Sequence, residues 1–93
     1  MNSKQKPILT EDEKVILKNL SKECKYIARD ENGDLKVFKR YPERLFDIWL
    51  DTLRKNCLID THKYLNVYNH LFPFIKWEDK KPYKIKELLN ANT

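Results

Sequence analysis

Two cysteines and two histidines are the residues of this chain that could bind a metal ion, and their spacing argues against it. They are Cys24, Cys57, His62 and His70. A structural zinc site usually contains a Cys-x2–4-Cys pair, and this sequence has none. On one helix the two histidines would lie two turns apart, too far for a single tetrahedral ion. We therefore expect two free thiols, no metal site and no other cofactor.

Acidic residues gather at two turns, but they do not suit acid–base catalysis. They are Asp30, Glu31 and Asp34 in one turn, and Glu78 and Asp79 in another. Exposed carboxylates in turns stay ionised, so they make poor general acids. Cys57 and His62 are five residues apart, and no element orients them as a nucleophile and its base. The sequence therefore predicts a protein that is not an enzyme.

Basic residues concentrate around the single glycine of the chain. They are Lys25, Arg29, Lys36, Lys39, Arg40 and Arg44. Tyr26, Phe38 and Tyr41 interleave with them, and a basic ribbon with aromatic rings can follow a phosphate backbone and stack on bases. The same pattern also describes an ordinary solvated hairpin, and no known DNA- or RNA-binding signature accompanies it. We expect these six residues to be exposed and to contact a partner rather than stabilise the fold.

Length and charge narrow the class of protein. A chain of 93 residues makes one small domain, and its net charge of +5 favours an acidic or polyanionic partner without requiring one. No stretch approaches the roughly 18 apolar residues of a membrane span, and the N-terminus lacks the apolar run of a signal peptide. We expect residues 1–8 to form a flexible tail, residues 9–93 to form a single globular domain, and the protein to stay in the cytoplasm.

The first half of the chain contains two local folding signals. Thr10 and Glu13 form a capping box, which predicts a helix from about residue 11 to about residue 21. Residues 24–30 and 35–40 flank a turn that contains Gly33, which predicts a β-hairpin. A type I turn capped by Asp30 with Gly33 as a bulge, or a type I′ turn at Asn32-Gly33, would close it. The two turns differ by one residue in register and so exchange the inward face.

The second half of the chain is predicted to be mainly helical. Leu45, Trp49, Leu53 and Cys57 recur every fourth residue, which is typical of a helix over residues 43–58. Asp60 or Thr61 can cap a further helix that ends at Pro73. The apolar face of that helix would contain Tyr64, Leu65, Tyr68, Leu71 and Phe72.

The C-terminal region is rich in aromatic residues and is expected to complete the core. Residues 74–77 alternate as a third short strand would, and a final helix is predicted over about residues 84–90. We expect Trp77 to anchor this closure of the core. The resulting order of elements predicts an α+β fold, in which an N-terminal helix and a β-hairpin pack against central and C-terminal helices.

Two motifs resemble those of a group of small uncharacterised proteins from phages and prophages of Gram-positive bacteria. They read Tyr26-Ile-Ala-Arg-Asp-x-x-Gly-x-Leu35 and Leu71-Phe-x-Phe-Ile-x-Trp-Glu-Asp-x-x-Pro-Tyr-x-Ile-x-x-Leu-Leu89. The opening segment Leu9–Leu20 is similar to the first helix of that group. The resemblance does not extend to residues 45–70, and Lys80-Lys81 stand where the group is expected to have two glutamates. It implies a phage accessory protein in a bacterial cytoplasm, and it implies no known activity.

Taken together, these observations favour a protein that works by binding. The first expectation is a phage-type accessory protein that binds and inhibits a host protein, such as a defence or nucleic-acid-processing factor. Aromatic residues and arginines, which the chain places together, dominate protein interfaces. The alternative is a protein that binds nucleic acid directly. A membrane partner is not expected.

Overall fold

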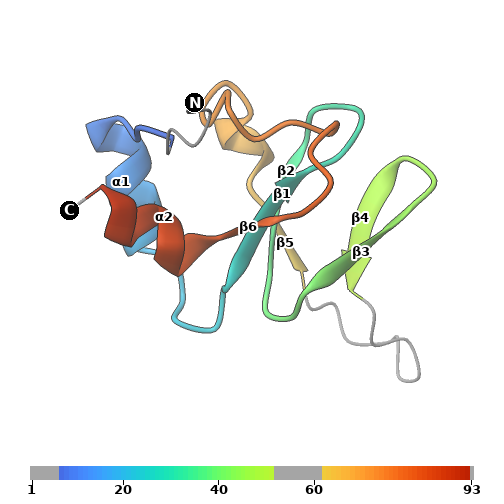
Figure 1. Cartoon of the computed structure of the whole chain (residues 1–93), viewed down its shortest axis with the longest axis horizontal. Helices are drawn as coiled ribbons and strands as arrows, with labels where there is room; N and C mark the ends of the chain where they lie inside the picture. The colour runs from blue at the N-terminus through green and yellow to red at the C-terminus, as the bar shows by residue number, and fades with distance from the viewer. Residues whose placement is uncertain (1–6, 52–61, 93) are drawn as a thin grey trace, which may run out of the picture.

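The computed structural model describes residues 7–51 and 62–92 and has an α+β fold, as the sequence predicts. In chain order its elements are α1 (Glu11–Lys18), β1 (Tyr26–Arg29), β2 (Leu35–Phe38), β3 (Pro42–Leu45), β4 (Ile48–Asp51), β5 (His62–Tyr64), the 3-10 helix η1 (Asn66–Tyr68), β6 (Tyr83–Lys84) and α2 (Ile85–Ala91). Figure 1 shows the two helices on one side of the central sheet and the β3–β4 hairpin on the other.

The central sheet is antiparallel and has the strand order β5-β2-β1-β6. Within residues 7–51 and 62–92, strands β3 and β4 pair only with each other and form a separate two-stranded sheet. Segments far apart in the sequence therefore meet at the two edges of the β1–β2 hairpin. Strand β5 adds to one edge and β6 to the other.

The turn between β1 and β2 has one of the two registers that the sequence leaves open. Gly33 donates its N–H to the carbonyl of Asp30 at 2.9 Å, and Asp30 donates its own N–H to the carbonyl of Asp34 at 2.9 Å. Gly33 has a φ of 100°, which a residue without a Cβ adopts easily. This is the type I turn followed by a glycine bulge, and it pairs Arg29 with Leu35.

The α1 helix begins as its capping box predicts. The Thr10 hydroxyl accepts the N–H of Glu13 at 3.2 Å, and the Glu13 carboxylate accepts the N–H of Thr10 at 2.9 Å. Glu13 also accepts the backbone N–H of Phe72 at 2.6 Å, and its side chain is buried. One carboxylate thus caps the start of the helix and ties it to the loop before β6. The predicted C-terminal helix is also present, as α2.

Both faces of the central sheet are covered. On one face Ile27, Leu35 and Val37 belong to the main core, together with residues of both helices. On the other face Ala28 and Phe38 pack with Trp49 of β4 in a second, smaller cluster. All four residues of β2 are consequently buried, including Lys36.

The helix predicted over residues 43–58 is wrong for its described part, where β3 and β4 form a hairpin. A period of four places Leu45 and Trp49 on one helical face, but Leu45 is half-exposed and Trp49 is buried. Between them, Phe46 has a φ of 57°, which no right-handed helix contains. The need to cover the second face of the sheet with flat strands overrides the local period. Leu53 and Cys57 lie outside the described residues.

The helix predicted from Asp60 or Thr61 to Pro73 is also wrong where the structure describes it. Residues 62–64 form strand β5, and between this strand and Pro73 the one helical segment is the short 3-10 helix η1. Asp60 and Thr61 themselves lie outside the described residues. An apolar face at helical spacing cannot reveal that the free edge of β2 takes another strand, because that edge exists only in the folded sheet.

The short strand predicted over residues 74–77 is a pair of turns instead. Ile75 donates its N–H to the carbonyl of Phe72 at 3.0 Å, and Asp79 donates to Lys76 at 3.1 Å. The core closes here on Phe72 and Ile75, which are fully buried, whereas Trp77 is only half-buried beside the second cluster. The residues that the structure describes include no helix that is long and apolar enough to cross a membrane.

Candidate protein interface

Arg29, one of the six predicted partner-binding residues, is used within the fold. Its guanidinium group donates five hydrogen bonds of 2.6 to 3.0 Å, each to a different backbone carbonyl. The acceptors are the carbonyls of Gly33, Asn69, Leu71, Phe72 and Ile75. An arginine side chain has five N–H donors, so none is left for a partner. The side chain holds the loop of residues 69–75 against the hairpin, and burial lowers its pKa.

Lys36 is also not exposed, and neither is its partner Asp30. The two side chains form an ion pair of 2.9 Å, with exposed fractions of 3% for Lys36 and 4% for Asp30. The expectation that Asp30 is a solvated turn carboxylate is therefore wrong as well. Strand β4 covers this face of β2, and a charge that is removed from water needs a partner of opposite charge.

The same ion pair attaches the β3–β4 hairpin to the central sheet. The N–H of Trp49 donates to Asp30 Oδ1 at 2.9 Å, and Lys36 Nζ donates to the carbonyl of Trp49 at 3.1 Å. Glu31 adds a backbone hydrogen bond of 3.1 Å to the carbonyl of Asp47. We call the side chains of Asp30 and Lys36, together with the backbone of Trp49 that they bind, the clamp.

The four other predicted partner-binding residues lie at the surface. Lys25 and Arg40 are exposed. Lys39 is exposed and pairs with Glu23 at 2.8 Å; the hydrogen bond that it donates to that carboxylate raises the pKa of Lys39. Arg44 stacks on Trp77, with its guanidinium carbon 3.8 Å from the ring centroid, and donates to the carbonyl of Asp79 at 2.9 Å. The basic residues therefore do not form one continuous binding ribbon.

The tip of the β3–β4 hairpin presents apolar side chains to solvent. Leu45 is 48% exposed, Phe46 is 90% exposed and Ile48 is 38% exposed. Phe46 is in the left-handed region of φ, which is strained for a bulky residue. Phe72 has the same φ of 57°, but its ring is buried in the core. The tip therefore combines an exposed ring with backbone strain, and no packing among the described residues compensates for that strain.

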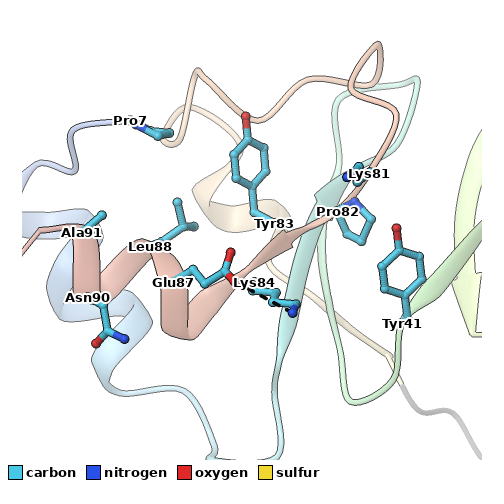
Figure 2. A pocket seen from close by; sticks show the side chains of 10 residues that line it. All are labelled: Pro7, Tyr41, Lys81, Pro82, Tyr83, Lys84, Glu87, Leu88, Asn90 and Ala91. Carbon is cyan, nitrogen blue, oxygen red and sulfur yellow. Dashed lines mark ion pairs between the residues drawn. The ribbon is translucent and has the colours of Figure 1, made fainter. Parts of the chain in front are cut away.

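A groove of about 830 Å³ forms a second surface feature, between strand β6, helix α2 and Tyr41 (Figure 2). Its lining residues are Pro7, Tyr41, Lys81, Pro82, Tyr83, Lys84, Glu87, Leu88, Asn90 and Ala91. Burial is the main cause that raises the pKa of Tyr83, followed by the negative charge of Asp79. The groove thus contains two tyrosines and two lysines, of which the sequence analysis placed only Tyr41 at a possible binding surface.

The sequence interpretation missed the hairpin tip because it assigned this segment to a helix. No local signal distinguished the two, because Glu43, Arg44 and Asp47 would lie on one face of a helix and the apolar residues on the other, as in an ordinary amphipathic helix. Of the metal candidates, Cys24 is a half-buried free thiol and His70 is exposed. Cys57 and the side chain of His62 are not described. Within residues 7–51 and 62–92, no group of three or more potential ligands could hold a metal ion.

Comparison with known protein families, with curated proteins and with solved structures finds no match to this chain.

Proposed function

We propose that this protein binds another protein and modulates it, and that the tip of the β3–β4 hairpin makes the contact. The observation that carries the proposal is the exposed cluster of Leu45, Phe46 and Ile48. Aromatic residues that a partner can bury supply most of the binding energy of protein interfaces. Exposing such a cluster on a strained turn costs stability, and a partner that covers it would offset the cost.

The hairpin is well suited to present this tip. The clamp holds β4 next to the tip through a buried ion pair, and the backbone of Glu31 in the β1–β2 turn donates to the carbonyl of Asp47 in the tip itself. Arg44 lies beside the tip and is stacked on Trp77, so one flank is rigid and positively charged. A rigid element loses little conformational entropy when it binds.

The proposed partner is a host protein of a bacterium, and the proposed effect on it is inhibition. The two motifs that resemble small phage and prophage proteins support this origin, and a defence or nucleic-acid-processing factor is the proposed class of target. The activity we propose is binding without catalysis. Asp30, the most buried carboxylate of its turn, is paired with Lys36 and is not free to exchange protons with a substrate.

The test is a capture experiment with three forms of the full chain: wild type, Phe46→Asp and Val67→Asp. Val67 is 73% exposed and lies on η1, so it is a matched control for adding a charge at an exposed apolar position. Each form is immobilised and incubated with lysate of a Gram-positive bacterium, with and without nuclease. We expect Phe46→Asp to lose a protein that wild type and Val67→Asp both retain after nuclease treatment.

Stability is measured in parallel, because loss of binding means little if the variant unfolds. Phe46→Asp should change the free energy of unfolding by no more than about 0.5 kcal/mol, since exposed substitutions rarely do more. Equal capture by wild type and Phe46→Asp would contradict the proposal. So would a captured complex that disappears with nuclease, which would favour direct binding of nucleic acid.

A further inference from the structure

The groove beside β6 lies along an edge of the central sheet. Strand β6 is the last strand in the order β5-β2-β1-β6, so one side of it pairs with β1 and the other has no strand beside it within the described residues. Residues Lys81 to Lys84 all line the groove. An unpaired strand edge is a template onto which another extended segment can add.

The backbone at β6 directs one N–H group and one carbonyl group toward this free edge. Ile85 donates its N–H to the carbonyl of Lys25, the residue before β1, at 3.0 Å, and Tyr26 of β1 lies opposite Lys84. Backbone groups alternate in direction along a strand, so the N–H of Lys84 and the carbonyl of Pro82 point away from β1. An added strand can therefore accept a hydrogen bond from the N–H of Lys84 and donate one to the carbonyl of Pro82.

The side chains around this edge select for negative charge. Lys81 and Lys84 are exposed on the groove, and Lys25 is exposed just before the neighbouring strand β1. Glu87 is the one acid that lines the groove, and it lies 3.9 Å from Lys84 (Figure 2). The excess of positive charge attracts an acidic segment and opposes a basic one.

The walls of the groove provide apolar contacts between the charges. Tyr41 is 49% exposed, packs edge-on against Tyr26 at 5.3 Å between ring centroids, and lies near Pro82 in Figure 2. Tyr83 packs against Phe74 at the same centroid distance of 5.3 Å, and Leu88 of α2 lines the groove with it. These rings are held in place by core residues, so an added strand would meet preformed pockets for its alternate side chains.

We propose that this groove binds an extended acidic segment of a partner protein, which adds as a strand to the free edge of β6. The inference rests on the proposed function only in that the partner is a protein. It assigns a surface that is separate from the hairpin tip.

The test begins with selection from a displayed library of random 12-residue peptides on the immobilised full chain. The most enriched peptide is then synthesised and titrated into the 15N-labelled protein, with amide shifts as the readout. We expect enriched peptides to be rich in Asp and Glu with apolar residues at alternate positions. The largest amide shifts should fall on Lys84 and its neighbours in β6.

Two variants and a control locate the binding site. Lys81→Glu with Lys84→Glu should weaken peptide binding at least tenfold, and Tyr41→Ser, which preserves the charges, should weaken it several-fold. Lys18→Glu with Lys22→Glu reverses two exposed charges that do not line the groove and should bind like wild type. The amide spectrum of each variant shows whether it is folded.

Three results would overturn the inference: no enrichment of acidic peptides, peptide binding that the groove variants do not change, or a twelve-residue oligothymidylate that binds β6 more tightly than the peptides. Phe46→Asp separates this inference from the proposed function, because it should leave peptide binding unchanged. If Phe46→Asp loses the lysate partner while no acidic peptide is selected, the hairpin proposal stands and the groove proposal fails.

Discussion

Individual charged residues in this protein differ sharply in whether they can meet a partner. Arg29 and Arg40 are eleven positions apart on the same hairpin region, yet Arg29 donates to five carbonyls while Arg40 is exposed. Lys36 and Lys39 differ in the same way, because one pairs with a buried Asp30 and the other with an exposed Glu23. Charge counts alone therefore overstate the surface available for binding.

Replacing Arg29 with lysine should destabilise the protein even though the charge is kept. Lysine has three donors in place of five, so at least two buried carbonyls lose their partner, each at about 1–3 kcal/mol. We expect Arg29→Lys to lower the free energy of unfolding in urea by about 2–5 kcal/mol. Arg40→Lys is the control and should stay within about 0.5 kcal/mol of wild type. Equal midpoints for the two variants would show that the carbonyl contacts contribute nothing.

The β3–β4 hairpin is the element on which the proposed function depends. An isolated two-stranded hairpin is marginally stable in water at best, so its attachment to the central sheet decides whether it is ordered. The clamp provides that attachment at Trp49, which is also the hairpin's main contribution to the second core cluster. Electrostatics and apolar packing thus act at the same residue.

The charges of Asp30 and Lys36 should be coupled, so the losses of stability from removing each charge alone should not be additive. Asp30→Ala leaves the Lys36 ammonium group buried without its counter-charge, and breaking a buried pair in this way typically costs about 3–5 kcal/mol. Lys36→Met removes that charge and retains a side chain of similar length. In a double-mutant cycle followed by urea unfolding, we expect the double variant to be at least about 1 kcal/mol more stable than the sum of the single losses. Additive losses would mean that the pair is not coupled.

Across the whole molecule, stability should be highest in the middle of the central sheet and lower in the β3–β4 hairpin. Strands β1 and β2 are covered on both faces, whereas β3 is largely exposed after Pro42. Regions with few buried contacts open locally without global unfolding. The central strands should therefore open only at a higher free energy than the β3–β4 hairpin.

Native-state hydrogen exchange measures this difference directly. The amides of Ala28 and Lys36, which lie opposite each other in β1 and β2, should exchange only through global unfolding. The amides of Glu43 and Leu50, paired in β3 and β4, should exchange with a lower opening free energy. Identical opening free energies for the two pairs would show that the hairpin unfolds only together with the sheet.

Local signals in the sequence determined the elements whose interactions are short-range. The capping box of Thr10 and Glu13 and the turn at Gly33 each involve residues at most a few positions apart, and both predicted elements are present. The α+β class followed from these elements and the final helix. The sequence could not choose between the two hairpin registers, because that choice depends on which face of the hairpin is buried.

The secondary structure of residues 43–51 and 62–77 depends on tertiary packing. The same packing determines which charged residues on β1 and β2 are buried. An apolar residue every fourth position favours a helix, but burying Ala28 and Phe38 on the second face of the sheet requires the flat hairpin that brings Trp49 to them. Once that hairpin covers β2, Lys36 must pair with Asp30. Burial is a property of elements that are distant in sequence, so no local pattern could reveal which charges remain free and which hold the fold together.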